Sequence, residues 1–139
     1  MGLIHKKADI EHIDTNIIVR LITGDDPKSY EKAKKLIAKK DKTYVFEDAA
    51  MMEVVFVLSS DAYHFSRKEV AAGIKFIMGF DNIYFNKSII EGTLDAYVSH
   101  PKLSIVDCYL AIVTETSGET PLWTLDHKLA TQCPIAKEL

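Results

Sequence analysis

The sequence is poor in residues that form disulfides or zinc sites. Its 139 residues include two cysteines, Cys108 and Cys133, which lie far apart and lack the spacing of paired metal ligands. The five histidines are scattered, and no His-x-x-x-His pair occurs. A disulfide framework and a zinc site are therefore not expected, and both cysteines are predicted to be free thiols.

Long hydrophobic runs are also missing. The longest, AAMMEVVFVL at residues 49–58, contains Glu53 and is far shorter than the ~20 residues that span a bilayer. The charged N-terminus MGLIHKKAD is not followed by the apolar segment of a secretory signal. We therefore expect a protein without a membrane helix that is located in the cytoplasm.

What is present is the composition of an ordinary globular protein. Hydrophobic residues make up 47% of the chain and charged residues 27%, and the formal net charge is −3. The chain has no low-complexity tract and no internal repeat. Such a chain can bury a core and is not expected to be disordered, and its length fits one domain.

Segments with strand and helix patterns alternate along the chain. Strands are predicted at residues 8–13, 43–47, 83–85 and 121–125. Helices are predicted at residues 16–23, 27–40, 49–60, 66–79, 88–100 and 104–118, with Asp26 capping the second of them. The alternation predicts an α/β fold whose central, mainly parallel β-sheet is flanked by helices on both faces.

Two acidic residues directly follow predicted strands. Asp14 comes after the strand 8–13, and Asp126 comes after the strand 121–125. Ligands of open parallel sheets bind outside the carboxyl ends of the strands, so these two acids should lie at the same edge. Each also has a plain structural interpretation, because Asp14 can be a helix N-cap and Asp126 a turn residue.

Glu53 lies in the middle of an apolar helix. The helix 49–60, which Asp48 is predicted to cap, is apolar almost all round and is therefore predicted to be buried. A buried carboxylate needs a partner or a metal. The alternative is a glutamate of the first turns, favoured by the helix dipole.

A fourth acid, Asp107, completes a group that could share a cation. The spacing Ser104-x-x-Asp107 is also that of a capping box, so Asp107 could serve only to begin a helix. Four carboxylates at one edge would repel one another unless a cation compensated them. Ligands made only of carboxylate oxygen favour Mg²⁺ or Mn²⁺, one or two ions of which can polarise a phosphodiester and activate water.

Four blocks of the sequence resemble the PIN-domain ribonucleases, specifically the VapC-like toxins of bacterial and archaeal toxin–antitoxin pairs. The blocks are IDTNIIVRLITGDDP, AAMMEVVFVL, SIVDCYLA and LWTLD, in the order and rough spacing of that family. They cover about residues 10–130. The resemblance implies a PIN domain at residues 10–139, preceded by an N-terminal extension at residues 1–9.

The resemblance also implies a site and an activity. The four acids of the family fall on Asp14, Glu53, Asp107 and Asp126, which would be both metal ligands and catalytic residues. Thr15, Asn16 and Thr124 match positions that support the acids through hydrogen bonds. The implied protein is a Mg²⁺- or Mn²⁺-dependent endoribonuclease, a homodimer and the partner of a cognate antitoxin. Its products would carry a 3′-hydroxyl and a 5′-phosphate.

An acidic protein with an acidic site needs cations to attract RNA. The predicted contacts are a basic helix face and further cations elsewhere, namely Lys28, Lys32, Lys35 and Lys39, with Arg20, Arg67, Lys68, Lys6 and Lys7. Any one of these lysines can equally be an ordinary solvated residue.

Other functions are compatible with the same pattern. The alternatives are a PIN-fold nuclease of RNA processing or DNA cleavage without an antitoxin, and a catalytically inactive PIN-fold binding module. Retention of all four acids speaks against the inactive module.

Overall fold

The computed structural model describes residues 10–139. The predicted N-terminal extension, with Lys6 and Lys7, and the first two residues of the predicted strand 8–13 lie outside the described residues. The chain divides into two compact units, Met1–Asn86 and Lys87–Leu139, called unit 1 and unit 2. A single domain over residues 10–139 therefore stays a prediction.

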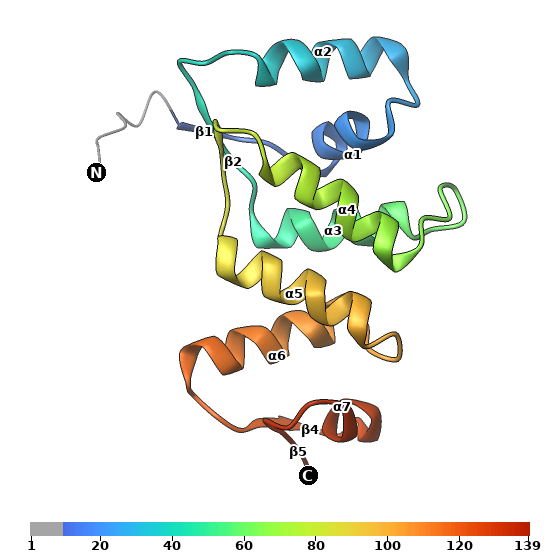
Figure 1. The fold of residues 1–139 in the computed structure, drawn as a ribbon, viewed down its shortest axis with the longest axis vertical. Coiled ribbons are helices and arrows are strands. Elements are labelled where there is room, and N and C mark those ends of the chain that lie inside the picture. The colour runs from blue at the N-terminus through green and yellow to red at the C-terminus, as the bar shows by residue number, and fades with distance from the viewer. Residues whose placement is uncertain (1–9) are drawn as a thin grey trace. The chain divides into compact units, whose positions relative to one another are not determined.

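Unit 1 contains a three-stranded parallel sheet and four helices (Figure 1). Strands β1 (Ile10–His12), β2 (Thr43–Val45) and β3 (Ile83–Tyr84) pair in that order, so that their carboxyl ends lie at one edge. The helices are α1 (Thr15–Thr23), α2 (Pro27–Ile37), α3 (Asp48–Leu58) and α4 (Arg67–Met78).

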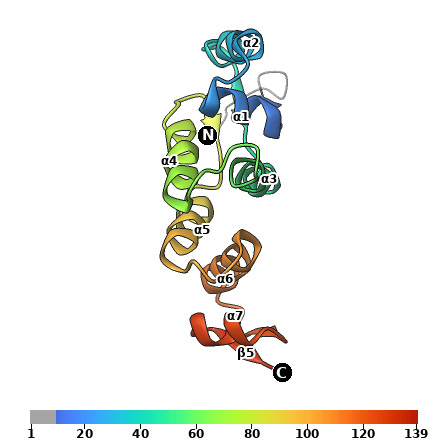
Figure 2. The same ribbon diagram turned by 90° about the vertical axis from the view of Figure 1, so that its right-hand side faces the viewer.

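The core of unit 1 is organised around α1. Helix α1 contacts α2, α3 and α4, and Figure 2 shows it among these three helices. Ile18 of α1, Met51 of α3 and Ile74 of α4 are fully buried. The approach of α1 to α4 requires Gly73, because a Cβ atom there would lie 2.9 Å from Cγ2 of Ile22. The apolar stripe of each helix thus fixes its position in the unit.

Unit 2 pairs two helices and adds a small parallel sheet. Helix α5 (Lys87–Ser99) packs against α6 (Ile105–Ser117). Strand β4 (Leu122–Thr124) pairs with β5 (Ala136–Glu138), and α7 (His127–Gln132) connects them. Strand β5 is not predictable from the sequence, because its residues AKE carry no strand pattern and only the pairing with β4 defines it.

The predicted α/β class with parallel strands is confirmed. The five strands that the structure describes pair in two sheets, one in each unit, rather than in one central sheet. Helix α2 ends at Ile37 instead of continuing to Lys40, because Nδ2 of the buried Asn82 donates to the carbonyl oxygens of Ile37 (2.8 Å) and Lys39 (3.2 Å). Within residues 10–139, no helix is long and apolar enough to cross a bilayer.

Two predictions about α3 are wrong. Its N-cap is Glu47, whose side chain makes no capping bond, and Asp48 is the first helical residue. The helix is also not buried all round. It turns Met51, Val54, Val55 and Leu58 to the core, whereas Glu53 is exposed and Phe56 is 53% exposed. An apolar sequence allowed burial on every side, but the packing of unit 1 uses only one side of the helix.

Candidate functional site

Asp14 lies where β1 ends and α1 begins. The backbone N–H of Ile13 donates to the carbonyl of Val45 (3.1 Å), which continues the strand pairing up to the acid. Asp14 is exposed, has an extended backbone and accepts a hydrogen bond from the N–H of Ile17 (3.4 Å). It is therefore both an N-cap and an acid at the carboxyl end of a strand, so the two interpretations are compatible.

Glu53 lies on the exposed side of α3, in the same unit as Asp14. The prediction that Glu53 is buried and needs a partner is wrong, because water can solvate this exposed side chain. Its exposure nevertheless leaves the carboxylate accessible to a ligand. Helices α1 and α3 pack against each other in unit 1; Asp14 caps α1, and Glu53 belongs to α3.

Asp107 and Asp126 both cap helices of unit 2. The N–H of Asp107 donates to Oγ of Ser104 (3.1 Å), and the N–H of Ser104 donates to Oδ2 of Asp107 (3.4 Å). The predicted capping box is thus confirmed. Asp126 caps α7 by accepting from the N–H of Lys128 (2.9 Å), and its own N–H donates to Oγ1 of Thr124 (2.9 Å). Thr124 therefore supports the backbone of Asp126.

The donor chemistry of these acids suits a hard divalent cation. A carboxylate has about four acceptor sites, so a single capping bond leaves room for a metal ion. Across residues 10–139, no group of three or more His, Cys, Asp or Glu side chains is arranged to hold a metal ion. Two of the four acids belong to unit 1 and two to unit 2, so a site shared by all four remains a prediction.

A hydrogen-bonded network joins the turn after α1 to the loop after α3. Gly24 ends α1 in the left-handed conformation (φ 61°), and Asp25 follows it. Nη1 of Arg20 donates to Oδ1 of Asp25 (2.9 Å) and to Oη of Tyr63 (3.2 Å). Tyr63 donates to Oδ2 of Asp25 (2.6 Å), and Thr23 donates to Oδ1 (2.7 Å). This network fixes the guanidinium of Arg20 in one place.

The network lowers the pKa of Asp25 from an ordinary 3.8 to about 2. The hydrogen bond from Tyr63 is the largest cause, followed by the bond from Thr23, and Arg20 adds to both. Each of these groups stabilises the ionised carboxylate. The network therefore stabilises the ionised carboxylate of Asp25.

We expect Tyr63→Phe to change the acid dependence of stability. Because the folded-state pKa of Asp25 is depressed, its contribution to the free energy of unfolding is present above its ordinary pKa and is lost as pH falls toward about 2. Urea unfolding followed by circular dichroism should show parent and variant differing above about pH 4 and converging toward pH 2. Tyr84→Phe, at an exposed tyrosine outside the network, is the control. A Tyr63→Phe difference that is constant with pH would contradict this assignment.

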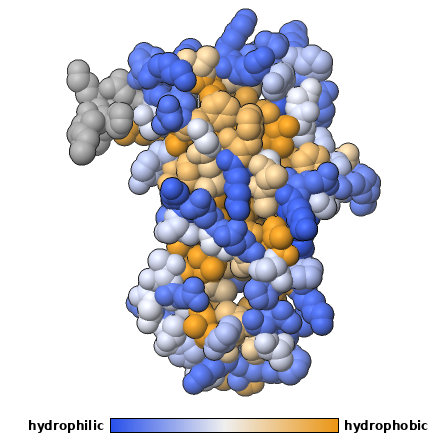
Figure 3. Space-filling view, in the orientation of Figure 1, coloured by the Kyte–Doolittle hydropathy of each residue, from blue (hydrophilic) through white to orange (hydrophobic). Residues whose placement is uncertain are grey.

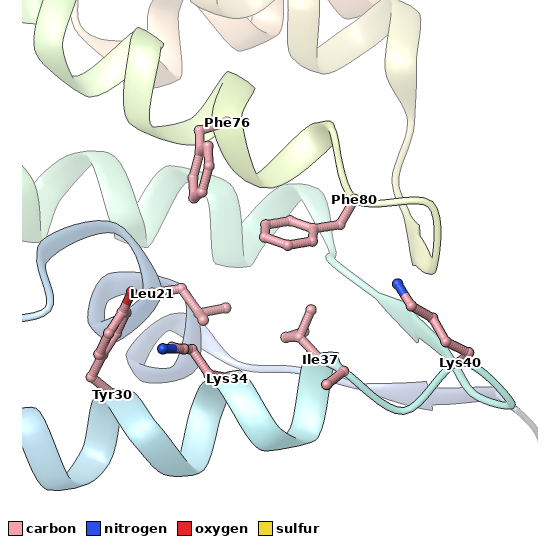
Figure 4. Close-up of a pocket in the computed structure, with 8 residues that line it drawn as sticks. Leu21, Tyr30, Lys34, Ile37, Lys40, Phe76 and Phe80 are labelled. Carbon is pink, nitrogen blue, oxygen red and sulfur yellow. The ribbon is translucent and has the colours of Figure 1, made fainter.

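An apolar groove of about 340 Å³ lies between α2 and the end of α4 (Figure 4). Tyr30, Lys34 and Ile37 enter it from α2, and Phe76 and Phe80 face them. Phe76 is 60% exposed, and its ring contacts that of Phe80 edge to face, with the centroids 5.4 Å apart. Figure 3 shows apolar side chains gathered in this region, below the hydrophilic side chains of α2. The groove is apolar with lysines at its margin.

A family comparison decides the class of the protein. The model of the PIN domain family matches residues 12–132, which include all four acids. The chain belongs to the PIN domain family. Its predicted membership is thereby confirmed.

The PIN domain also has similar solved structures. One is VapC20 of Mycobacterium tuberculosis, a toxin that cleaves the sarcin–ricin loop, with 17% identity, a TM-score of 0.41, and coverage of 88% of this chain and 93% of that chain. Another is VapBC2 of Rickettsia felis bound to a DNA fragment from their promoter, with 14% identity, a TM-score of 0.36, and coverage of 93% and 98%. No curated protein matches the chain by sequence.

The structure of this PIN domain also shows polar residues at the sheet edge that no sequence motif indicates. A hollow of about 340 Å³ at the carboxyl ends of β2 and β3 is lined by Glu47, Asp48, Tyr84 and Asn86, among others. Nδ1 of His12, at the end of β1, lies 3.4 Å from Oε1 of Glu47. These residues lie together because β1, β2 and β3 are neighbours in the sheet. No local sequence motif indicates that they do.

Proposed function

We propose that this PIN domain protein is a metal-dependent ribonuclease that hydrolyses RNA phosphodiester bonds and is the toxin of a toxin–antitoxin pair. The observation that carries the proposal is the family match over residues 12–132, within which Asp14, Glu53, Asp107 and Asp126 are all present. The exposure of Asp14 and Glu53 supports it, because both can meet a polymeric substrate. The ions would be Mg²⁺ or Mn²⁺, one or two of them.

The four acids would bind the metal ions in different roles. Asp14, Glu53 and Asp107 would hold a first ion, and Asp126 would complete the cluster or hold a second. When bound, the ion supplies Lewis-acid stabilisation of the charge that develops on the phosphodiester and favours ionisation of the attacking water. The chain itself orients the acids, since backbone N–H groups of Ile17 and Lys128 hydrogen-bond the carboxylates of Asp14 and Asp126. Thr15 and Asn16 would support the same site.

The proposed partners are RNA, a cognate antitoxin protein and a second copy of the chain. The exposed Phe56 of α3 and Phe76 of α4 support protein contacts, because large apolar side chains on a surface favour association. The groove of Figure 4 suits a partner segment with apolar anchors and acidic flanks, since it combines aromatic walls with Lys34 and Lys40.

The test is cleavage of defined single-stranded RNAs by the purified protein. We expect cutting with Mg²⁺ or Mn²⁺, no cutting in EDTA, and recovery when Mg²⁺ is added in excess, because the carboxylates alone cannot stabilise a phosphodiester transition state. DNA of the same sequence distinguishes a ribonuclease from a general nuclease. Cleavage that proceeds equally in EDTA, or no cleavage of any RNA, would overturn the proposal.

A further inference from the structure

The basic face of α2 is not uniform. Lys28, Lys32, Lys35 and Lys39 are all exposed. Lys32 lines a pocket together with Arg20 of α1, and the other three lysines are not part of that lining. This hollow, the α1–α2 pocket, has a volume of about 440 Å³ and is lined by Asn16, Ile17, Arg20, Ser29, Lys32, Ala33 and Leu36. A pocket that joins one lysine of the face to a fixed arginine differs from a solvated surface.

The α1–α2 pocket is held in shape by the turn between its two helices. Asp26 caps α2 through the N–H of Ser29 (3.4 Å) and accepts from its Oγ (3.0 Å). Arg20 is fixed by Asp25 and Tyr63, and both of these bonds use Nη1. A guanidinium carries five N–H donors, so a fixed arginine can present further donors to a ligand without reordering.

The lining combines two kinds of surface. Arg20 and Lys32 carry positive charge, whereas Ile17, Ala33 and Leu36 are apolar. A phosphate alone would use only the cations, but a nucleotide unit also presents the apolar face of its base and sugar. Two carboxylates lie nearby: Asp25 is paired with Arg20, whereas Asp26 accepts hydrogen bonds from the neutral Ser29 and keeps its negative charge. The pocket therefore offers cations beside an apolar surface.

The α1–α2 pocket also begins next to a proposed metal ligand. Asn16 lies two residues after Asp14, and Arg20 lies about 9 Å further along the axis of α1 than Asp14, at 1.5 Å per residue. A ligand bound in the α1–α2 pocket would lie next to Asp14 without occupying the position of the metal ion. We propose that the α1–α2 pocket is a subsite for one nucleotide of single-stranded RNA beside the cleaved bond, with Lys32 and Arg20 contacting its phosphate. The choice of RNA as ligand rests on the proposed function.

Binding measured without cleavage tests this subsite separately from the activity. Fluorescence anisotropy of a labelled single-stranded RNA is recorded in EDTA over a range of salt concentrations, with the parent, Lys32→Ala, Lys32→Arg and Lys35→Ala. Lys35 is also one of the predicted RNA contacts but does not line the pocket, so Lys35→Ala removes the same charge from the same helix and separates a pocket from a diffuse basic face. Circular dichroism confirms that each variant is folded.

We expect Lys32→Ala to weaken RNA binding about tenfold and to reduce the salt slope by about 0.7, the value for one lost phosphate contact to a single strand. Lys32→Arg should retain most of the affinity, and Lys35→Ala should change it less than about twofold. Equal losses for Lys32→Ala and Lys35→Ala would overturn the subsite in favour of a diffuse basic face. If Lys32→Ala binds RNA as tightly as the parent, the subsite is also overturned. A weaker interaction of this variant with a protein partner would not rescue it.

The two proposals can fail independently. If the parent cleaves RNA with Mg²⁺ but Lys32→Ala binds RNA like the parent, the subsite is wrong and the nuclease stands. If the parent cleaves no RNA but Lys32→Ala selectively loses RNA binding, the nuclease is wrong, and the α1–α2 pocket is supported only as an RNA-binding site without a cleaved bond beside it.

Discussion

Replacing Asp14 by Asn, or Glu53 by Gln, is expected to reduce metal-dependent RNA cleavage about a hundredfold or more. A bound divalent ion contributes several kcal/mol of transition-state stabilisation, and each 1.4 kcal/mol is about tenfold in rate. Both substitutions keep the size of the side chain and remove the charge that attracts the cation. Because both side chains are exposed, the fold should tolerate the change. Initial rates with saturating Mg²⁺ measure the effect.

A neutralised acid elsewhere in unit 1 controls for loss of charge alone. Glu31→Gln changes an exposed glutamate of α2 whose Oε1 lies 3.5 Å from Nζ of Lys34, a long ion pair. It should cleave RNA at the rate of the parent. If folded Asp14→Asn and Glu53→Gln proteins also cut as fast as the parent, the assignment of these residues as metal ligands is wrong.

Local signals in the sequence predicted local structure well. Asp26 before Pro27 and Ser104 with Asp107 are caps in the structure, because a cap depends on residues within one turn of each other. Gly24 ends α1 for the same kind of reason, since its positive φ suits glycine. The family match covers residues 12–132, a range in which all four acids lie, and their assignment as metal ligands stays a prediction.

Features that depend on packing were not predictable in the same way. Glu53 was expected to be buried because its neighbours are apolar, but only the contacts of α3 decide which side of that helix faces the core. The bond between Tyr63 and Asp25 joins residues 38 positions apart, and neither residue lies in a motif that indicates the other. The spacing of the lysines does not distinguish Lys32 from Lys35, because it assigns both to the same basic face of α2. Only the packing of α1 beside α2 shows that Lys32 lines the pocket.

Asp107 permits the sharpest separation of a structural role from a catalytic one. Its capping box with Ser104 is present, so the structural interpretation is correct as far as it goes. If Asp107 is also a metal ligand, Asp107→Asn should lower RNA cleavage about a hundredfold or more, because the remaining amide is a weaker ligand for a hard cation. The loss of helix stability from removing this charge should be only about 0.3–1 kcal/mol.

Ser104→Ala supplies the matched control for that prediction. It removes the other half of the capping box, in which Oγ accepts from the N–H of Asp107 at 3.1 Å, and should cost about 1 kcal/mol of unfolding free energy. Its carboxylate at Asp107 is intact, so RNA cleavage at a temperature where both variants are folded should stay near that of the parent. Chemical denaturation and cleavage rates of the two variants measure the two effects separately. Equal activity of Asp107→Asn and Ser104→Ala would show that Asp107 serves the helix alone, and the metal site would then have to be built from the other three acids.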